Sequence, residues 1–157
     1  MGLSRKLRVV DVTMGQIGAH QHQIAAIATV AVEFQLGCTR PMSILAFHGT
    51  DDPLVPYDNG AVGLSLPGVK VRGTLLNMGD WARLDHCRTS LRRAQVGSQV
   101  IRRQWAGCAD GTTVVLYTIL GGGHSWPGAD PAKAVGLTTE QVSATAQTLS
   151  FFSRRQN

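Results

Sequence analysis

Two short apolar runs, each ending at a glycine turn, constrain the fold of this chain more than any other feature. Residues 42–47 run into His48 and Gly49, and residues 113–120 run into three consecutive glycines. Apolar runs of this length, bounded by turn residues, are typical of buried strands in an α/β sheet. Ligands bind such sheets outside the carboxyl ends of the strands, so functional side chains are expected in these two turns.

Both turns carry titratable side chains. His124 follows the three glycines directly, and Asp52 lies just after the first run. A carboxylate and a histidine on neighbouring strand ends can form the orienting half of a Ser-His-Asp triad, because the acid fixes the tautomer of the histidine that deprotonates the nucleophile. The order acid before histidine fits the α/β-hydrolase order of nucleophile, acid, histidine. A lone histidine in a turn would more simply be solvated, and the upstream acid favours the functional interpretation.

Three blocks of sequence, residues 48–57 (HGTDDPLVPY), 105–112 (WAGCADGT) and 121–128 (GGGHSWPG), resemble the carboxyl-terminal half of the polyhydroxybutyrate depolymerase and feruloyl esterase family. They occur in the family's order, and similarity runs from about residue 24 to residue 152. The resemblance implies a partial α/β-hydrolase fold, with a mostly parallel sheet, flanking helices and no amino-terminal strands. Residues 24–157 would form this half domain, and residues 1–23 are poorly interpretable.

The resemblance also implies a function and its site. Members of the family are secreted serine esterases, so it implies ester hydrolysis by acyl transfer on a polyhydroxyalkanoate or a feruloyl or acetyl ester, outside the cytoplasm and without cofactor or metal. His124 would be general base and then acid, and the pattern His-Gly-x-x-Asp-x-x-Val-Pro assigns the orienting acid to Asp52. Asp51 would be a turn residue and His48 structural. Trp126 would either wall the acyl pocket or pack over the sheet edge.

The nucleophile is the weak point of this interpretation. A Gly-x-Ser-x-Gly elbow is absent from the sequence, and the nearest candidate is Ser4, in a Gly-Leu-Ser tripeptide followed by Arg5 and Lys6. Ser4 is either the remnant of the nucleophile or part of a chance tripeptide, and its surroundings favour chance. The chain is therefore expected to be truncated and weakly active or inactive alone.

In the resembling family Cys87 and Cys108 are expected to be bridged, closing a loop of about 20 residues that would add about 3 kcal/mol of stability. Cys38 is left over, as a free thiol or as a sign that sequence is absent. The three cysteines lack paired spacing, and His20 with His22 lacks a third ligand nearby, so no metal site is expected.

Composition excludes some classes of protein. The chain has 157 residues and a net charge of +5, and its arginines are spread over separate segments, so a solvated surface is favoured over a nucleic-acid partner. Its apolar runs fall short of the roughly 20 residues that span a membrane. Residues 1–20 lack the apolar core and cleavage site of a signal peptide.

The remaining sequence predicts a few further elements. The sequence favours an irregular excursion over residues 54–77 and helical spacing over residues 81–93. The expected strands are residues 24–32 and residues 96–105, the latter forming a hairpin with residues 113–120 through Asp110-Gly111. A capping box of Thr138 and Gln141 would open a terminal helix over residues 142–152.

Two rivals to an active esterase remain. The first is a non-enzymatic remnant that keeps the scaffold and half the triad, and it differs from the enzyme in not needing Ser4 near His124. The second is a small basic protein that binds an acidic polymer, which arginines clustered on one face would favour. A half sheet would also leave residues 24–32 or a neighbouring strand as a sticky edge, so self-association is predicted.

Overall fold

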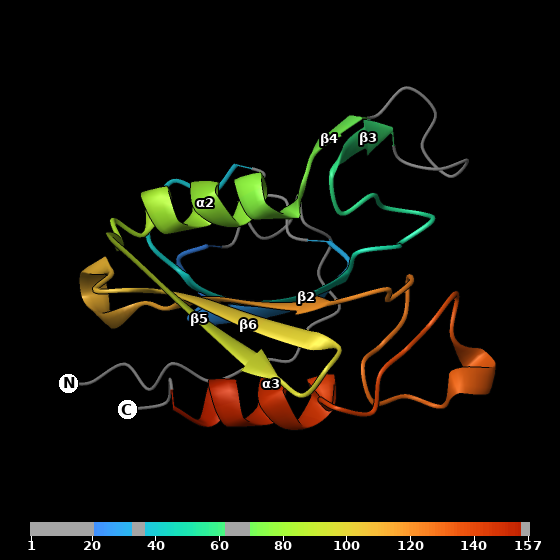
Figure 1. Ribbon diagram of the computed structural model, residues 1–157. Helices are drawn as coiled ribbons and strands as arrows, with labels where there is room; N and C mark the ends of the chain where they lie inside the picture. The colour runs from blue at the N-terminus through green and yellow to red at the C-terminus, as the bar shows by residue number, and fades with distance from the viewer. Residues whose placement is uncertain (1–20, 33–36, 62–69, 155–157) are drawn as a thin grey trace.

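The computed structural model describes residues 21–32, 37–61 and 70–154, and its centre is a five-stranded sheet with one helix on each face (Figure 1). The strand order is β1-β2-β7-β6-β5. The strands are β1 (Ala26–Val30), β2 (Ser43–Gly49), β7 (Val114–Ile119), β6 (Val100–Ala106) and β5 (Arg88–Val96). The remaining elements are a small antiparallel pair, β3 (Asn59–Ala61) and β4 (Lys70–Arg72), two 3-10 turns, η1 (Ala109–Gly111) and η2 (Pro131–Lys133), and the helices α2 (Thr74–Leu84) and α3 (Ala144–Ser153).

The sheet is mixed. β1 pairs with β2 and β2 with β7 in parallel, whereas β7 pairs with β6 and β6 with β5 in antiparallel. The expectation of a mostly parallel sheet is therefore wrong. The connections from β5 to β6 and from β6 to β7 are too short for a crossover, so they can join only antiparallel neighbours. The chain has α/β character with flanking helices, and the five strands of the main sheet fall short of establishing a complete α/β-hydrolase fold.

Two apolar clusters hold the helices to the sheet, and the alternation of side chains along β2 divides the residues between them. Ile44 and Ala46 belong to the cluster that packs under α2, and Leu45 and Phe47 belong to the cluster that packs under α3. All four are essentially inaccessible to solvent. β2 is therefore a fully buried interior strand, as the apolar run of residues 42–47 predicts.

The helix α2 differs from expectation at both ends. It begins at Thr74, inside the segment expected to be irregular, and the predicted helical residues 88–93 belong to strand β5. Met78 and Trp81 are fully buried and lie three residues apart, so one face of the helix packs on the sheet. His86, with a φ of 50°, follows Asp85, which caps the carboxyl end of the helix.

The strand and hairpin predictions around the second glycine turn are confirmed. β6 and β7 overlap the two predicted strands and pair antiparallel across η1, which contains Asp110 and Gly111. The terminal helix α3 is also present, but the predicted capping box is wrong. Ser143 caps the helix by accepting the Ala146 amide hydrogen at 3.3 Å. The side chain of Thr138 instead donates to the Trp126 carbonyl.

The arginines of the β5–β6 hairpin do not gather on one face. Arg88, Arg92, Arg93, Arg102 and Arg103 all lie on the β5–β6 hairpin. Because successive strand residues point to opposite faces, Arg102 and Arg103 point to different sides of the sheet. This arrangement counts against a single basic surface. Among the described residues, no helix is long and apolar enough to cross a membrane.

Cys87 and Cys108 form a disulfide that ties the start of β5 to the loop after β6. Cys38 takes no part in a disulfide and is half-buried. Burial, and secondarily the nearby Asp85 carboxylate, raises the pKa of the Cys38 thiol. A thiol with a raised pKa is mostly protonated at neutral pH and is a poor nucleophile.

The disulfide predicts a measurable stabilisation. The double variant Cys87→Ala/Cys108→Ala should lose about 3 kcal/mol of unfolding free energy. The disulfide joins cysteines 21 positions apart, and without it the unfolded chain gains the conformational entropy of that loop. Urea unfolding with and without dithiothreitol measures the difference. The reductant should destabilise the wild type and leave the double variant unchanged, and an equal effect on both would contradict the prediction.

Candidate functional site

Backbone hydrogen bonds join the two turns at the carboxyl ends of β2 and β7. The amide of Thr50 donates to the Ile119 carbonyl, and the amide of Asp51 donates to the Gly122 carbonyl, both at 2.9 Å. In return, the Gly121 amide donates to Thr50 Oγ1 at 2.8 Å. The parallel pairing of the strands is thus continued beyond their ends, and the turn after β2 is fixed against the turn after β7.

Glycine is required where these turns meet. A β-carbon on Gly49 would lie 2.1 Å from the Gly122 carbonyl oxygen, and one on Gly123 would lie 2.3 Å from the Val135 carbonyl oxygen. Gly121 has a φ of 70°, which glycine adopts readily. The glycines therefore permit the close backbone approach that brings the two turns together.

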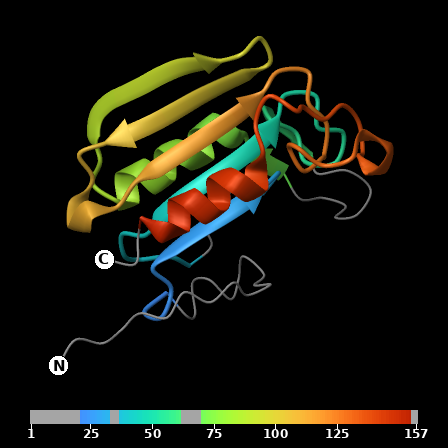
Figure 2. The ribbon, with the colours of Figure 1, turned by 90° about the horizontal axis from the view of Figure 1, so that it is seen from below.

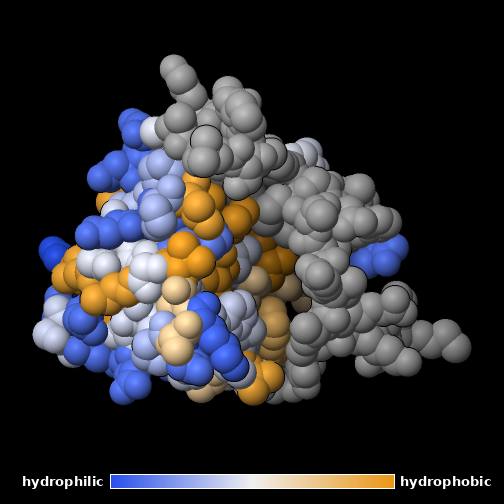
Figure 3. All heavy atoms as spheres, turned by 90° about the vertical axis from the view of Figure 1, so that its right-hand side faces the viewer, coloured by the Kyte–Doolittle hydropathy of each residue, from blue (hydrophilic) through white to orange (hydrophobic). Residues whose placement is uncertain are grey.

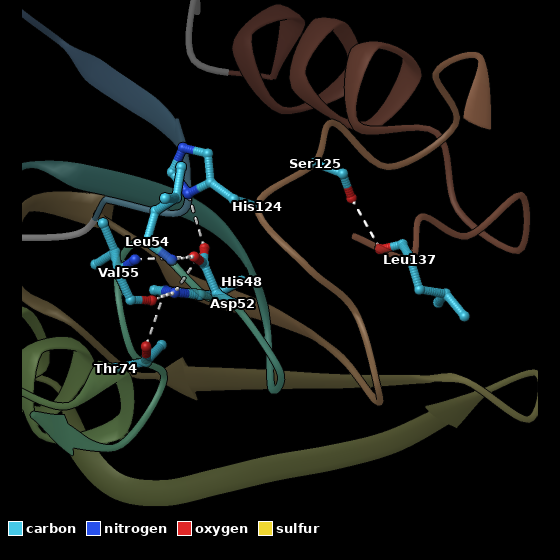
Figure 4. Close-up of polar contacts among 8 residues, drawn as sticks. All are labelled: His48, Asp52, Leu54, Val55, Thr74, His124, Ser125 and Leu137. Carbon is cyan, nitrogen blue, oxygen red and sulfur yellow. Dashed lines mark hydrogen bonds and ion pairs between the residues drawn. The ribbon is translucent and has the colours of Figure 1, made fainter. Parts of the chain in front are cut away.

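Asp52 lies at the centre of the site with its side chain fully buried. Its Oδ1 accepts the amide hydrogens of Leu54 and Val55, each at 2.8 Å, so the acid organises its own turn (Figure 4). Its Oδ2 lies 2.9 Å from His124 Nδ1. Hydrogen bonds to a carboxylate compensate for the loss of water around a buried charge.

The ring of His124 is only partly buried. Its side chain is 33% exposed, and its loop is held by a bridge to Val135 and by the Gly123 amide, which donates to the Leu137 carbonyl at 2.8 Å. Because a carboxylate can only accept, Nδ1 carries a hydrogen, and in the neutral ring Nε2 then carries the lone pair. The imidazole is thus in the tautomer that can remove a proton from a nucleophile.

His48 lies beneath Asp52 and is completely buried. Its Nε2 is 2.9 Å from the Val55 carbonyl and 3.5 Å from Asp52 Oδ2, and its Nδ1 is 2.9 Å from Thr74 Oγ1. The carbonyl requires a hydrogen on Nε2, so in the neutral ring Nδ1 accepts from the Thr74 hydroxyl. His48 therefore connects the acid turn to the first residue of α2, in keeping with the structural role expected of it.

The residues beside His124 point elsewhere. Ser125 donates its hydroxyl to the Leu137 carbonyl at 3.0 Å and lies apart from the imidazole (Figure 4). Trp126, which is 47% exposed, donates its indole hydrogen to Thr145 on α3.

Four exposed apolar side chains follow β7 at this end of the molecule. Figure 3 looks onto this end and shows apolar surface between hydrophilic side chains. They are Leu120, Trp126, Val135 and Leu137.

The nucleophile is not among the described partners of the histidine. Within residues 21–32, 37–61 and 70–154, no hydroxyl or thiol is hydrogen-bonded to His124 Nε2. Ser4 and His20 lie outside the described residues, and His22 is exposed. The same part of the chain contains no group of three or more side chains that could hold a metal ion.

Two features of the site were missed by the sequence analysis. Thr74 was placed in an irregular segment, and its bond to His48 depends on where α2 begins. The Leu54 and Val55 amides that hold Asp52 were also missed, although an aspartate that accepts amides two and three residues ahead is a common turn arrangement. The spacing Asp52-x-Leu54-Val55 was therefore an available signal.

Comparison with known proteins gives distant similarity to esterases. No protein-family model matches the chain. Feruloyl esterase B of Piromyces equi is 33% identical over 88 residues, which make up 55% of this chain and 16% of that protein. NocK of Nocardia uniformis subsp. tsuyamanensis, provisionally named an esterase, is 28% identical over 156 residues, covering 84% of this chain and 44% of that protein. The chain thus spans less than half the length of either relative, and the similarity indicates an esterase relationship at most.

Gly49→Ala should separate the two turns, because its β-carbon would lie 2.1 Å from the Gly122 carbonyl oxygen. We expect a loss of about 1–3 kcal/mol of unfolding free energy, measured by urea unfolding. Gly79→Ala is the matched control, since an added β-carbon there meets nothing within 4 Å and α2 should gain about 1 kcal/mol. Equal stabilities of the two variants would contradict the close approach.

Thr74→Val tests whether the hydrogen bond between α2 and His48 stabilises the acid turn. The valine removes the donor to His48 Nδ1 at a fully buried position, so we expect a loss of about 1–3 kcal/mol of unfolding free energy. Thr74→Ser keeps the hydroxyl and should retain most of the stability. A valine variant as stable as the serine variant would show that the hydrogen bond contributes nothing.

Proposed function

We propose that this chain is the carboxyl-terminal part of a serine-type carboxylic ester hydrolase, with His124 as general base and then acid and Asp52 as the orienting acid. The observation that carries the proposal is the 2.9 Å contact of His124 Nδ1 with the buried Asp52 carboxylate. It leaves Nε2 with a lone pair on a part-exposed ring, where a hydroxyl nucleophile could be deprotonated.

The reaction would proceed by acyl transfer. The nucleophile attacks the ester carbonyl while His124 takes its proton, and the histidine then gives that proton to the departing alcohol. Water, deprotonated by the same histidine, would then attack the acyl group, and its bond to the nucleophile would break as the histidine returns the proton to the nucleophile oxygen and the acid is released. Asp52 would stabilise the imidazolium formed in each step. Ser4 is the candidate nucleophile in this chain.

The finer assignments belong to the same proposal. The resemblance to the polyhydroxybutyrate depolymerase and feruloyl esterase family suggests a polyhydroxyalkanoate or a feruloyl or acetyl ester as substrate, and an extracellular or periplasmic location that the Cys87–Cys108 disulfide also favours. Residues 24–157 would be the half domain. Trp126 would border the acyl or aromatic group, and the edge of β1 remains the predicted surface for self-association.

A non-enzymatic remnant of such an esterase is the second candidate. It is favoured by one observation, that His124 Nε2 has no hydroxyl partner among the described residues. Loss of nucleophile and oxyanion hole would remove most of the rate enhancement of a triad enzyme. The dispersal of the arginines over both faces of the β5–β6 hairpin counts against the third candidate, a basic protein that binds an acidic polymer.

Hydrolysis of 4-nitrophenyl acetate by the purified chain tests the proposal. We expect weak turnover above background, reduced at least about 100-fold in His124→Ala and in Asp52→Asn, because each removes part of the proton-transfer machinery. Ser125→Ala is the matched control and should leave the rate unchanged, since that hydroxyl is bonded to Leu137.

Ser4→Ala distinguishes the sources of the nucleophile. Activity lost in Ser4→Ala as well as in His124→Ala would identify Ser4, and activity lost only in His124→Ala would assign the nucleophile to another residue. A chain without turnover would favour the non-enzymatic remnant over an active esterase, and turnover that survives His124→Ala would overturn the role proposed for the histidine.

A further inference from the structure

A second polar site lies on the α3 face of the sheet, away from the two turns. On this face α3 lies over β2, and none of the described helices lies over β6 or β5 (Figure 2). A cavity of about 340 Å³ lies beside α3, within the range of about 300–1,000 Å³ that small-molecule sites occupy. Its lining residues are Leu45, Arg102, Gln104, Thr113, Val115, Tyr117, Gln147, Phe151 and Arg154.

The cavity is separate from the candidate catalytic site. It includes Thr113, which precedes β7, whereas His124 follows the other end of that strand. Val115 and Tyr117 of β7 also line it, but none of the residues of the two turns does, so the cavity shares the strand with the candidate catalytic site and not its side chains.

The polar groups of the cavity are already paired in a way that leaves mainly donors. Gln104 Oε1 accepts from Arg102 Nη2 at 2.8 Å, and Gln147 Oε1 accepts from the Tyr117 hydroxyl at 3.1 Å. Each glutamine has thus committed its carbonyl oxygen and keeps its NH₂ group for another partner. Arg102 retains further N–H donors, and its guanidinium is held 5.9 Å from the centre of the Tyr117 ring.

The charge of the cavity has one sign. Arg102 and Arg154 carry two positive charges, and none of the lining residues is acidic. The floor beneath them is apolar, because Leu45, Val115 and Phe151 are buried members of the cluster under α3. The complementary ligand accepts hydrogen bonds, carries negative charge and has an apolar part.

We propose that this cavity binds the carboxylate of a small organic acid that has an apolar body. The carboxylate accepts from Arg102, with Gln104, Gln147 and Arg154 as the neighbouring donors, and the apolar body rests on Leu45, Val115 and Phe151. Arginine binds planar carboxylates through paired hydrogen bonds, which favours this group over a spherical anion. The proposal is independent of the proposed esterase activity.

The proposal is tested by titrating the purified full chain with benzoate and recording the amide chemical shifts in NMR spectra at each benzoate concentration. We expect saturable shifts at β6 and α3, with binding at least about tenfold weaker for benzamide, which has the same shape without charge, and for inorganic phosphate, which lacks the apolar body. Added salt should weaken benzoate binding.

Arg102→Gln should weaken benzoate about tenfold or more. The matched control is Arg93→Gln, which removes the same charge from an exposed position on the same hairpin and outside the cavity. Arg154→Gln, at the exposed end of α3, is the second variant and keeps the test decisive if Arg102→Gln fails to fold. Benzamide or phosphate binding as tightly as benzoate, equal effects of Arg93→Gln and the cavity variants, or an absence of saturable shifts would each overturn the proposal.

Discussion

The parallel pairing of β2 with β7 is the interaction on which the candidate site depends. Asp52 and His124 are 72 positions apart in the sequence, and neither could find the other without a register that ends both strands at the same edge of the sheet. Hydrogen bonds from Thr50 and Asp51 extend this register into the turns, so the contact between acid and histidine follows from backbone geometry. The backbone brings the two turns together, and the side chains of Asp52 and His124 then form the hydrogen bond between them.

Burial divides the two partners into different roles. Asp52 is out of solvent and receives donors from Leu54, Val55 and His124, so its position is determined from several directions. His124 is held on one side only, and the other side of its ring faces outward. A fixed anion behind a partly accessible imidazole suits proton transfer, because orientation is established before a substrate arrives. His48 and Thr74 add a second layer, which makes the geometry of the acid turn depend on the start of α2.

The elements around the site could be predicted from the sequence where the local pattern was strong. The continuous apolar run before His48 and the run before the three glycines are both strands, and their turns do bring Asp52 and His124 together. Predictions failed where tertiary packing decided the outcome. α2 begins at Thr74 because Met78 and Trp81 pack on the sheet, although local spacing favoured a later start. The second antiparallel pair of the mixed sheet was missed because the residues of β5 were expected to continue a helix, whereas the β6–β7 hairpin was predicted.

The donor-rich cavity beside α3 could not be predicted by counting charges along the sequence. Its two arginines are far apart in the chain and come together only because β6 and the end of α3 are neighbours in the fold.

The stretch between acid and histidine has another consequence. It contains the β5–β6 hairpin, which supplies no residue to the Asp52–His124 contact or to the hydrogen bonds that hold the acid turn. The length of this hairpin can therefore change without moving either residue, so related sites are better recognised by their two strand-and-turn units than by a constant interval between them.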